Sequence, residues 1–274
     1  MRKTLYMLTA LAFLSAAWTS VAQEARLSAF KENYVTTGIP LNVRPNWNTN
    51  DLTFQISAKY SLATDIGGKG WDLFAGYTQL SVWDVYRPSN PFRCHTYMPG
   101  LYVYHPFKSD PYGVVNDILF GYEHHSNGYA GELSRTLDFL FATYTHTFAG
   151  QFTLQATGRF GIGSIYNTFS LEMFDRYQGY VNAALCYHTR DRGLMVSASA
   201  TPLFKGDIPA NVSAEIAFRP AFARGFYLVA RYHYGYDENQ LDCAVPDVFL
   251  KHMVRFGLAL MPDVLSHKFL TMIL

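Results

Sequence analysis

Two neighbouring side chains, His124 and Ser126, form the pair with the clearest chemical potential in this sequence. They belong to the segment 121–128, which reads Gly-Tyr-Glu-His-His-Ser-Asn-Gly. Residues two apart on a β-strand project from the same face. A histidine beside a serine therefore places a general base next to a potential nucleophile. The same row contains the apolar residues Ile118 and Phe120, so we expect the pair on a lipid-facing surface, where polar groups are costly unless they are used.

The strand predicted after this segment offers a third residue that could act together with His124 and Ser126. If the hairpin turns about Gly131, residues whose numbers sum to 262 lie opposite each other, which places Asp138 opposite His124. Directly opposed residues have Cβ atoms about 4.5–5.5 Å apart. Asp138 would accept a hydrogen bond from His124 and fix its tautomer, while the other ring nitrogen takes the proton of Ser126. His125 is expected on the opposite, inward face, without a catalytic role.

Alternation of apolar and polar residues predicts the elements that carry these side chains. Segments of about ten residues with one apolar and one polar row match the strands of an outer-membrane barrel. The alternation predicts twelve strands, near 33–43, 52–64, 71–85, 95–106, 114–126, 135–148, 151–163, 176–188, 194–204, 210–220, 226–236 and 249–261. An even number suits a bacterial single-chain barrel, so the predicted fold is all-β, a twelve-stranded antiparallel transmembrane β-barrel.

Composition agrees with this architecture and excludes others. Charged residues make up 16% of the chain, below the roughly one quarter of soluble domains, yet the mean hydropathy is only -0.02. Nothing after residue 22 approaches the ~18 consecutive apolar residues of a membrane helix. A net charge of +1 without a basic stripe argues against a nucleic-acid partner. Residues 1–22 have the pattern of a secretory signal peptide, which leaves residues 23–274 as the outer-membrane β-barrel domain.

The longer sequence around the pair resembles a known family. The histidine and serine motif is followed by Ser134-Arg135-Thr136-Leu137-Asp138, and is preceded by Tyr77-Thr78-Gln79 and by Ser89-Asn90-Pro91-Phe92-Arg93. Together these segments closely resemble the outer-membrane phospholipase A family, which has H-x-S-N-G followed by S-R-x-x-N, with the Asn twelve residues after the Ser. The spacing is kept here, with Asp138 in place of the Asn. The resemblance covers roughly residues 33–262.

This resemblance implies an outer-membrane phospholipase that hydrolyses phospholipid acyl esters, of the A1/A2 and lysophospholipase type, with its active site at the outer leaflet of the bacterial outer membrane. Ser126 would attack the ester, His124 would act as general base and then as acid, and Asp138 would orient His124.

The resemblance also implies a cofactor and a partner. Calcium would bind the carbonyl of Ser89, the carbonyl of Tyr129 and the hydroxyl of Ser134. Gln79 matches a residue at a dimer interface in the family, so we expect a homodimer whose formation gates activity.

Two other functions stay open from the sequence. A lipid A deacylase is a smaller barrel enzyme with an H-x-S motif and an acidic third residue, which Asp138 fits slightly better than an Asn would. The length of residues 23–274 favours twelve strands over eight and argues against this reading. A non-enzymatic barrel, either a passive pore or a structural protein, is the second alternative, because a polar lumen permits a narrow channel.

Overall fold

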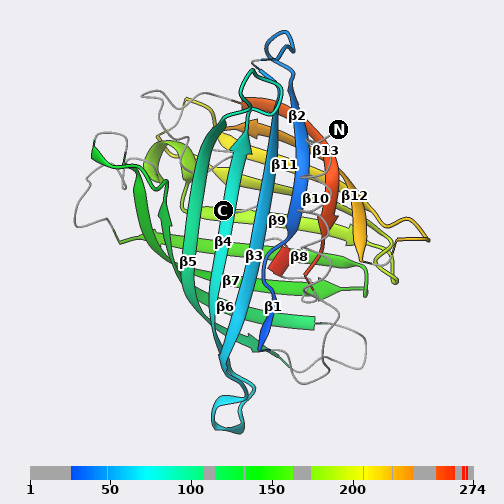
Figure 1. Cartoon of the computed structure of the whole chain (residues 1–274). Helices are drawn as coiled ribbons and strands as arrows, with labels where there is room; N and C mark the ends of the chain where they lie inside the picture. The colour runs from blue at the N-terminus through cyan, green and yellow to red at the C-terminus, as the bar shows by residue number, and fades with distance from the viewer. Residues whose placement is uncertain are drawn as a thin grey trace.

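The computed structural model describes residues 26–47, 49–107, 115–131, 134–162, 174–205, 207–223, 225–236, 251–262, 267–268 and 270 (Figure 1). The predicted signal peptide, residues 1–22, lies outside these ranges and stays a prediction.

The described chain is built almost entirely of strands. Their bounds are β1 Leu27–Ala29, β2 Asn33–Pro40, β3 Asp51–Ala63, β4 Asp72–Trp83, β5 Phe92–Pro106, β6 Val115–Ser126, β7 Thr136–Phe148, β8 Phe152–Gly161, β9 Val181–His188, β10 Leu194–Pro202, β11 Ala210–Phe218, β12 Phe226–Gly235 and β13 Lys251–Leu260. Two short helical turns, η1 Ile66–Gly68 and η3 Phe174–Gln178, lie between strands. No helix in the described part of the chain is long and apolar enough to cross a membrane.

The strands close into a barrel. Each pairs antiparallel with its neighbours, and β13 pairs with β2. Both β1 and β2 pair with β3, at different points along it, so together they form one barrel strand interrupted at residues 30–32. The predicted fold, a twelve-stranded antiparallel β-barrel, is therefore confirmed. Figure 1 shows the strands as one continuous wall.

One predicted strand begins later than expected. Residues 176–188 were expected to be extended, but the η3 turn runs to Gln178 and β9 begins at Val181. Between them Gly179 has a φ of 67°, in the left-handed region that a regular strand cannot use. The prediction for residues 176–180 is therefore wrong, because a local turn replaces the pleat there.

Burial alternates along the strands in the sense expected of a membrane barrel. On β8 the outward Leu154 and Phe160 are 45% and 68% exposed, whereas the inward Gln155 and Thr157 are each 1% exposed. The apolar row faces outward and the polar row faces inward, the reverse of a soluble sandwich.

Charged side chains meet across the interior. The interruption at residues 30–32 turns three consecutive side chains inward, and Phe30, Lys31 and Glu32 are all buried. Lys31 Nζ lies 2.7 Å from Glu123 Oε1 on β6, and Glu32 Oε2 lies 2.6 Å from Arg231 Nη2 on β12. Ion pairs thus connect this interrupted strand to β6 and to β12 through the barrel interior.

Candidate active site

The β6–β7 hairpin carries the predicted catalytic residues in the predicted register. His124 pairs with Asp138, and Ser126 pairs with Thr136. The three candidate catalytic side chains therefore project from one outer face, near the end of the strands where β6 gives way to the loop 127–135. This confirms the register that was predicted from a turn about Gly131.

The loop after Ser126 is shaped by Asn127 and Gly128. Asn127 is 2% exposed, and its Oδ1 accepts hydrogen bonds from the N–H groups of Tyr129 at 3.2 Å and Arg135 at 3.0 Å. Gly128 has a φ of 72°, and a Cβ there would lie 2.7 Å from the ring of Tyr97. The Asn-Gly part of the motif is thus explained by loop closure, because one residue ties the loop and the next must lack a side chain.

A hydrogen bond joins two members of the predicted triad. His124 Nδ1 lies 2.8 Å from Asp138 Oδ1. An ionised carboxylate only accepts, so Nδ1 carries the proton and Nε2 is left as the basic nitrogen. Ser126 lies two residues along the same row, and it makes no hydrogen bond to His124 among the described contacts. The contact with an ionised Asp138 would therefore leave His124 in the tautomer that a general base requires, with the candidate nucleophile Ser126 on the same row.

These groups are partly exposed on the outer face of the barrel. The side chains of His124 and Asp138 are 36% and 17% exposed, and the row of His124 on β6 continues with Phe120 and Tyr122, which are 42% and 39% exposed. A polar trio therefore lies at the end of an otherwise apolar lipid-facing row, as expected from the sequence.

Tyr122 is a fourth residue of this group, and the sequence motif does not predict it. Its hydroxyl donates to Asp138 Oδ1 at 2.7 Å, the same oxygen that contacts His124. Tyr122 pairs with Leu140 and is therefore a diagonal neighbour of Asp138, within reach of an aromatic side chain. The predicted register contained this signal, because it already placed Tyr122 two residues before His124 on the same row.

The inward row of β6 forms a separate buried cluster behind the site. His125 Nε2 lies 2.7 Å from Glu123 Oε2, and both side chains are at most 1% exposed. The ring of His125 packs edge-on against Phe139 at 4.7 Å. His125 thus faces the lumen, as expected.

The predicted calcium residues lie on two connections at the end of the barrel that carries the triad. Tyr129, 40% exposed, and Ser134, half-buried, share the loop after β6, and the Ser134 N–H donates to the Gly131 carbonyl at 3.1 Å. Within the described residues, no group of three or more His, Cys, Asp or Glu could hold a metal ion. The predicted donors are hydroxyl and carbonyl oxygens, which fit calcium, a cation that prefers oxygen ligands.

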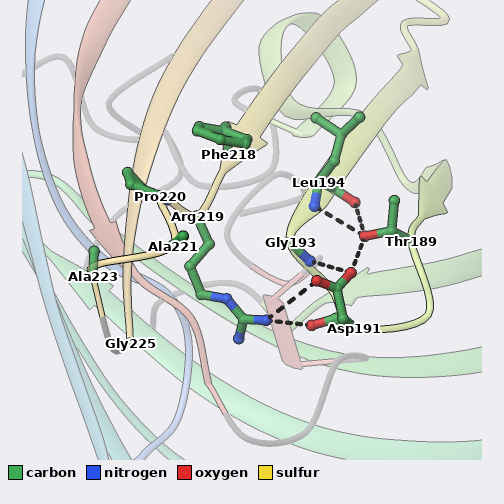
Figure 2. A pocket seen from close by; sticks show the side chains of 10 residues that line it. All are labelled: Thr189, Asp191, Gly193, Leu194, Phe218, Arg219, Pro220, Ala221, Ala223 and Gly225. Atoms are coloured by element: carbon green, nitrogen blue, oxygen red, sulfur yellow. Dashed lines mark hydrogen bonds and ion pairs between the residues drawn. The ribbon is translucent and has the colours of Figure 1, made fainter.

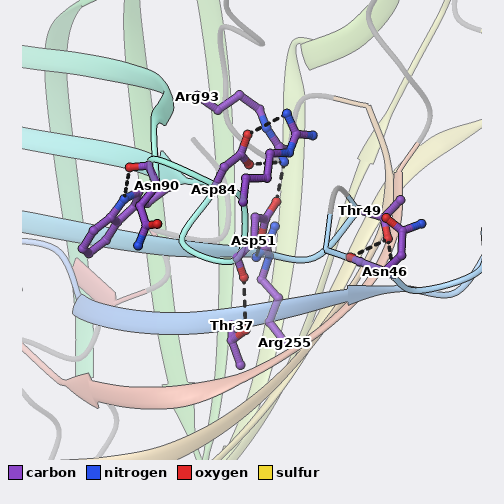
Figure 3. Close-up of polar contacts among 10 residues, drawn as sticks. Thr37, Asn46, Thr49, Asp51, Asp84, Asn90, Arg93 and Arg255 are labelled. Carbon is purple, nitrogen blue, oxygen red and sulfur yellow. Dashed lines mark hydrogen bonds and ion pairs between the residues drawn. The ribbon is translucent and has the colours of Figure 1, made fainter. Parts of the chain in front are cut away.

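Ser89 lies in the connection between β4 and β5, which a polar network fastens to the barrel rim (Figure 3). Arg93 forms ion pairs with Asp84 and, at 3.2 Å, with Asp51. Asp51 also pairs with Arg255 on β13. Ser89 itself is exposed and has a φ of 65°. These ion pairs therefore hold the two ends of the β4–β5 connection, near Asp84 and Arg93, against the barrel, whereas Ser89 lies between them and is exposed.

Gln79 belongs to a polar ladder on the outer face. Tyr77 donates to Gln79 Oε1 at 3.1 Å, and Gln79 Nε2 donates to Ser81 Oγ at 3.2 Å. Ser81 Oγ lies 2.9 Å from His95 Nδ1. Tyr97 connects this ladder to the triad, because it pairs with Gln79 on one side and with Ser126 on the other. The predicted interface residue and the predicted nucleophile thus share one face of the barrel.

A pocket lies at the other end of the strands, around the β9–β10 and β11–β12 turns (Figure 2). There the Thr189 hydroxyl donates to Asp191 at 2.6 Å, which holds the pKa of that carboxyl below its ordinary value, and Arg219 lies beside it. None of the predicted site residues lines this pocket.

Comparison with known proteins shows the family. The sequence matches the family model of phospholipase A1 over residues 4–247. The chain belongs to the phospholipase A1 family. It is 28% identical to phospholipase A1 of Salmonella typhimurium over 211 residues, which cover 72% of this chain and 68% of that relative. It is 38% identical to a putative phospholipase A1 of Neisseria meningitidis serogroup B over 97 residues, 34% of this chain, a match that spans only 25% of that relative.

Solved structures agree on the fold. Outer membrane phospholipase A from Escherichia coli is similar with a TM-score of 0.73 at 22% identity, covering 89% of this chain and 95% of that chain. The Salmonella typhi outer membrane phospholipase dimer with bound calcium is similar with a TM-score of 0.73 at 22% identity, covering 88% of this chain and 95% of that chain. The family resemblance predicted from the sequence is confirmed, and the phospholipase family and the barrel fold locate the protein in the bacterial outer membrane.

Proposed function

We propose that this protein is a calcium-dependent phospholipase that cleaves phospholipid acyl esters with Ser126, His124 and Asp138, at the outer leaflet. The observation that carries the proposal is the 2.8 Å contact between His124 Nδ1 and Asp138 Oδ1 on the outer face of the barrel, with Ser126 on the same row. Such a group of polar side chains is costly on a lipid-facing surface unless it is used.

The proposed reaction follows from the tautomer of His124. Ser126 Oγ attacks the ester carbonyl while Nε2 of His124 removes its proton, and Asp138 stabilises the imidazolium that forms. His124 then protonates the departing alcohol of the lysophospholipid, and the acyl group stays on Ser126. A water molecule, deprotonated by His124, releases the fatty acid and regenerates Ser126.

The outer face also suits the substrate. Phe120 and Leu140, 42% and 49% exposed, lie on neighbouring lipid-facing rows below the triad. An acyl chain from the surrounding membrane can lie along these side chains with its ester at the level of Ser126. The enzyme therefore has no need of an enclosed pocket, because the bilayer itself delivers the substrate.

Calcium and a second subunit complete this proposal. Tyr129 and Ser134 would hold the ion with neutral oxygens, and the carbonyl of Ser89 would be a further ligand. When bound, the ion supplies positive charge near the oxygen that becomes negative during attack. Tyr77 and Gln79 lie on the outer face beside the triad, so pairing of two chains through this face would bury polar groups and bring the two sites together.

The test compares wild type with Ser126→Ala in the hydrolysis of phospholipid and of lipid A, with calcium. We expect fatty acid release from phospholipid by wild type and almost none by Ser126→Ala. Ser199→Ala, on the inward row of β10, is the matched control and should retain activity. Release of acyl chains from lipid A alone would contradict the proposed substrate, and full activity of Ser126→Ala would contradict the proposed nucleophile.

A further inference from the structure

We propose that Tyr122 is a positioning residue, which holds the Asp138 carboxylate in the orientation that His124 requires. This inference rests on the proposed function of Ser126, His124 and Asp138. Its basis is the hydroxyl of Tyr122, which donates to Asp138 Oδ1 at 2.7 Å, while His124 Nδ1 lies 2.8 Å from the same oxygen. Asp138 thus receives two hydrogen bonds from one strand.

The hairpin alone creates this arrangement. His124 lies directly opposite Asp138, and Tyr122 lies diagonally opposite it, two residues further from the loop. Diagonal neighbours on one face are about 7–8 Å apart, a separation that a tyrosine side chain spans. Since all three residues belong to the outer rows of β6 and β7, the contact forms whenever the hairpin takes its register.

Two donors on one oxygen have two consequences for Asp138. They compensate part of the cost of placing a carboxylate on a lipid-facing surface, where its side chain is only 17% exposed. They also restrict rotation of the carboxylate, because a rotation that breaks one hydrogen bond breaks the other. The carboxylate then stays aligned with Nδ1–H of His124, and Nε2 stays available to Ser126.

Among the described hydrogen bonds, the Tyr122 hydroxyl bonds to Asp138 and to neither Ser126 nor His124, so its proposed effect passes through Asp138. Hydrogen bonds to an ionised acceptor are roughly twice as strong as those to a neutral one. The contribution of the Tyr122 hydroxyl should therefore depend on the charge of residue 138. A tyrosine that merely contacts lipid would contribute equally whatever residue stands at 138.

Tyr144 provides a matched control on the same barrel face. It is 46% exposed, and its hydroxyl donates at 3.1 Å to the neutral amide oxygen of Asn116, near the other end of the hairpin. Tyr144→Phe therefore removes an outward-facing hydroxyl and one hydrogen bond without touching the triad.

The experiment is a double-mutant cycle in kcat and KM with phospholipid in mixed micelles, at saturating calcium. We expect Tyr122→Phe to lower kcat about tenfold, with little change in KM, when residue 138 is Asp. In the Asp138→Asn protein, Tyr122→Phe should lower kcat only about threefold, because the acceptor is then a neutral amide oxygen. Tyr144→Phe should leave kcat unchanged, and thermal unfolding should show that the Tyr122→Phe barrel is intact.

Equal losses of kcat in the two backgrounds, or an unchanged kcat in Tyr122→Phe, would overturn the proposal. Ser126→Ala separates this failure from failure of the proposed function. If Ser126→Ala is inactive while Tyr122→Phe is fully active, the triad stands and the role of Tyr122 is wrong. If Ser126→Ala is fully active, the proposed function itself is wrong.

Discussion

The ion pair between Lys31 and Glu123 gives a quantitative test of how the barrel interior stabilises β6, the strand that contains the proposed catalytic residues His124 and Ser126. Lys31 lies in the interruption between β1 and β2, and Glu123 lies on β6 between Tyr122 and His124. Their side chains are 1% and 0% exposed, and the two charged atoms are 2.7 Å apart. Lys31→Met keeps most of the side-chain volume but leaves the Glu123 carboxylate without its cation.

The magnitude follows from the remaining partners of Glu123. Removal of one member of a buried pair costs about 3–5 kcal/mol, since it leaves an uncompensated charge. Here Tyr102 still donates to Glu123 Oε1 at 2.7 Å, and His125 Nε2 lies 2.7 Å from Oε2. We therefore expect Lys31→Met to lower the free energy of unfolding by about 3 kcal/mol, the lower end of this range. Adding Glu123→Gln removes the orphaned charge and should recover most of that loss.

Equilibrium unfolding in urea, with the protein in lipid vesicles and followed by the fluorescence of Trp47, Trp71 and Trp83, measures these changes. Lys69→Met, which alters an exposed lysine in the β3–β4 connection, is the control and should change stability by less than about 0.5 kcal/mol. A loss of stability below about 1 kcal/mol in Lys31→Met would show that the ion pair does not stabilise the barrel as expected. So would a double variant that is no more stable than Lys31→Met alone.

Three further predictions concern the site. Asp138→Asn should retain at least about a tenth of kcat, because an amide oxygen can still accept from His124, whereas Asp138→Ala should lose more than about a hundredfold; steady-state phospholipid hydrolysis checks both. EDTA should abolish hydrolysis and calcium should restore it. The Ser134→Ala protein should require a higher calcium concentration than wild type for the same activity. Full activity in EDTA would show that Ser89, Tyr129 and Ser134 do not hold a required calcium ion. Gln79→Ala should weaken dimerisation, measured by energy transfer between labelled chains in detergent micelles, and an unchanged dissociation constant would place the interface elsewhere.

The alternation of apolar and polar residues was sufficient to predict most of the fold, because each regular strand exposes one row of side chains to lipid and the other to the lumen. The alternation also predicted the barrel face on which His124 and Ser126 lie. A hairpin turn centred on Gly131 predicted that Asp138 pairs with His124. The interruption at residues 30–32 could not be predicted in this way. Four consecutive buried side chains, residues 30–33, break the period of two, and the partners of Lys31 and Glu32 come from strands far away in the sequence.

Contacts between side chains that are distant in the sequence could not be predicted from the sequence either. Lys268 lies past the last strand, yet it is buried and pairs with Glu215 on β11. No local pattern marks such a residue, since its burial depends on the chain folding back into the lumen. Tyr122 is different, because its diagonal position relative to Asp138 followed from the predicted register. What the register alone did not reveal is the direction of its hydroxyl.

We propose that Ser126 is a nucleophile activated by His124 on the outer face of the barrel. A long-chain alkyl fluorophosphonate, which forms a covalent adduct with activated serines, tests this directly when the labelled peptide is identified by mass spectrometry. We expect one adduct on Ser126, no adduct in Ser126→Ala, labelling slowed at least about a hundredfold in His124→Ala, and protection by phospholipid micelles. A folded protein that stays unlabelled at Ser126, or that labels equally fast without His124, would contradict it.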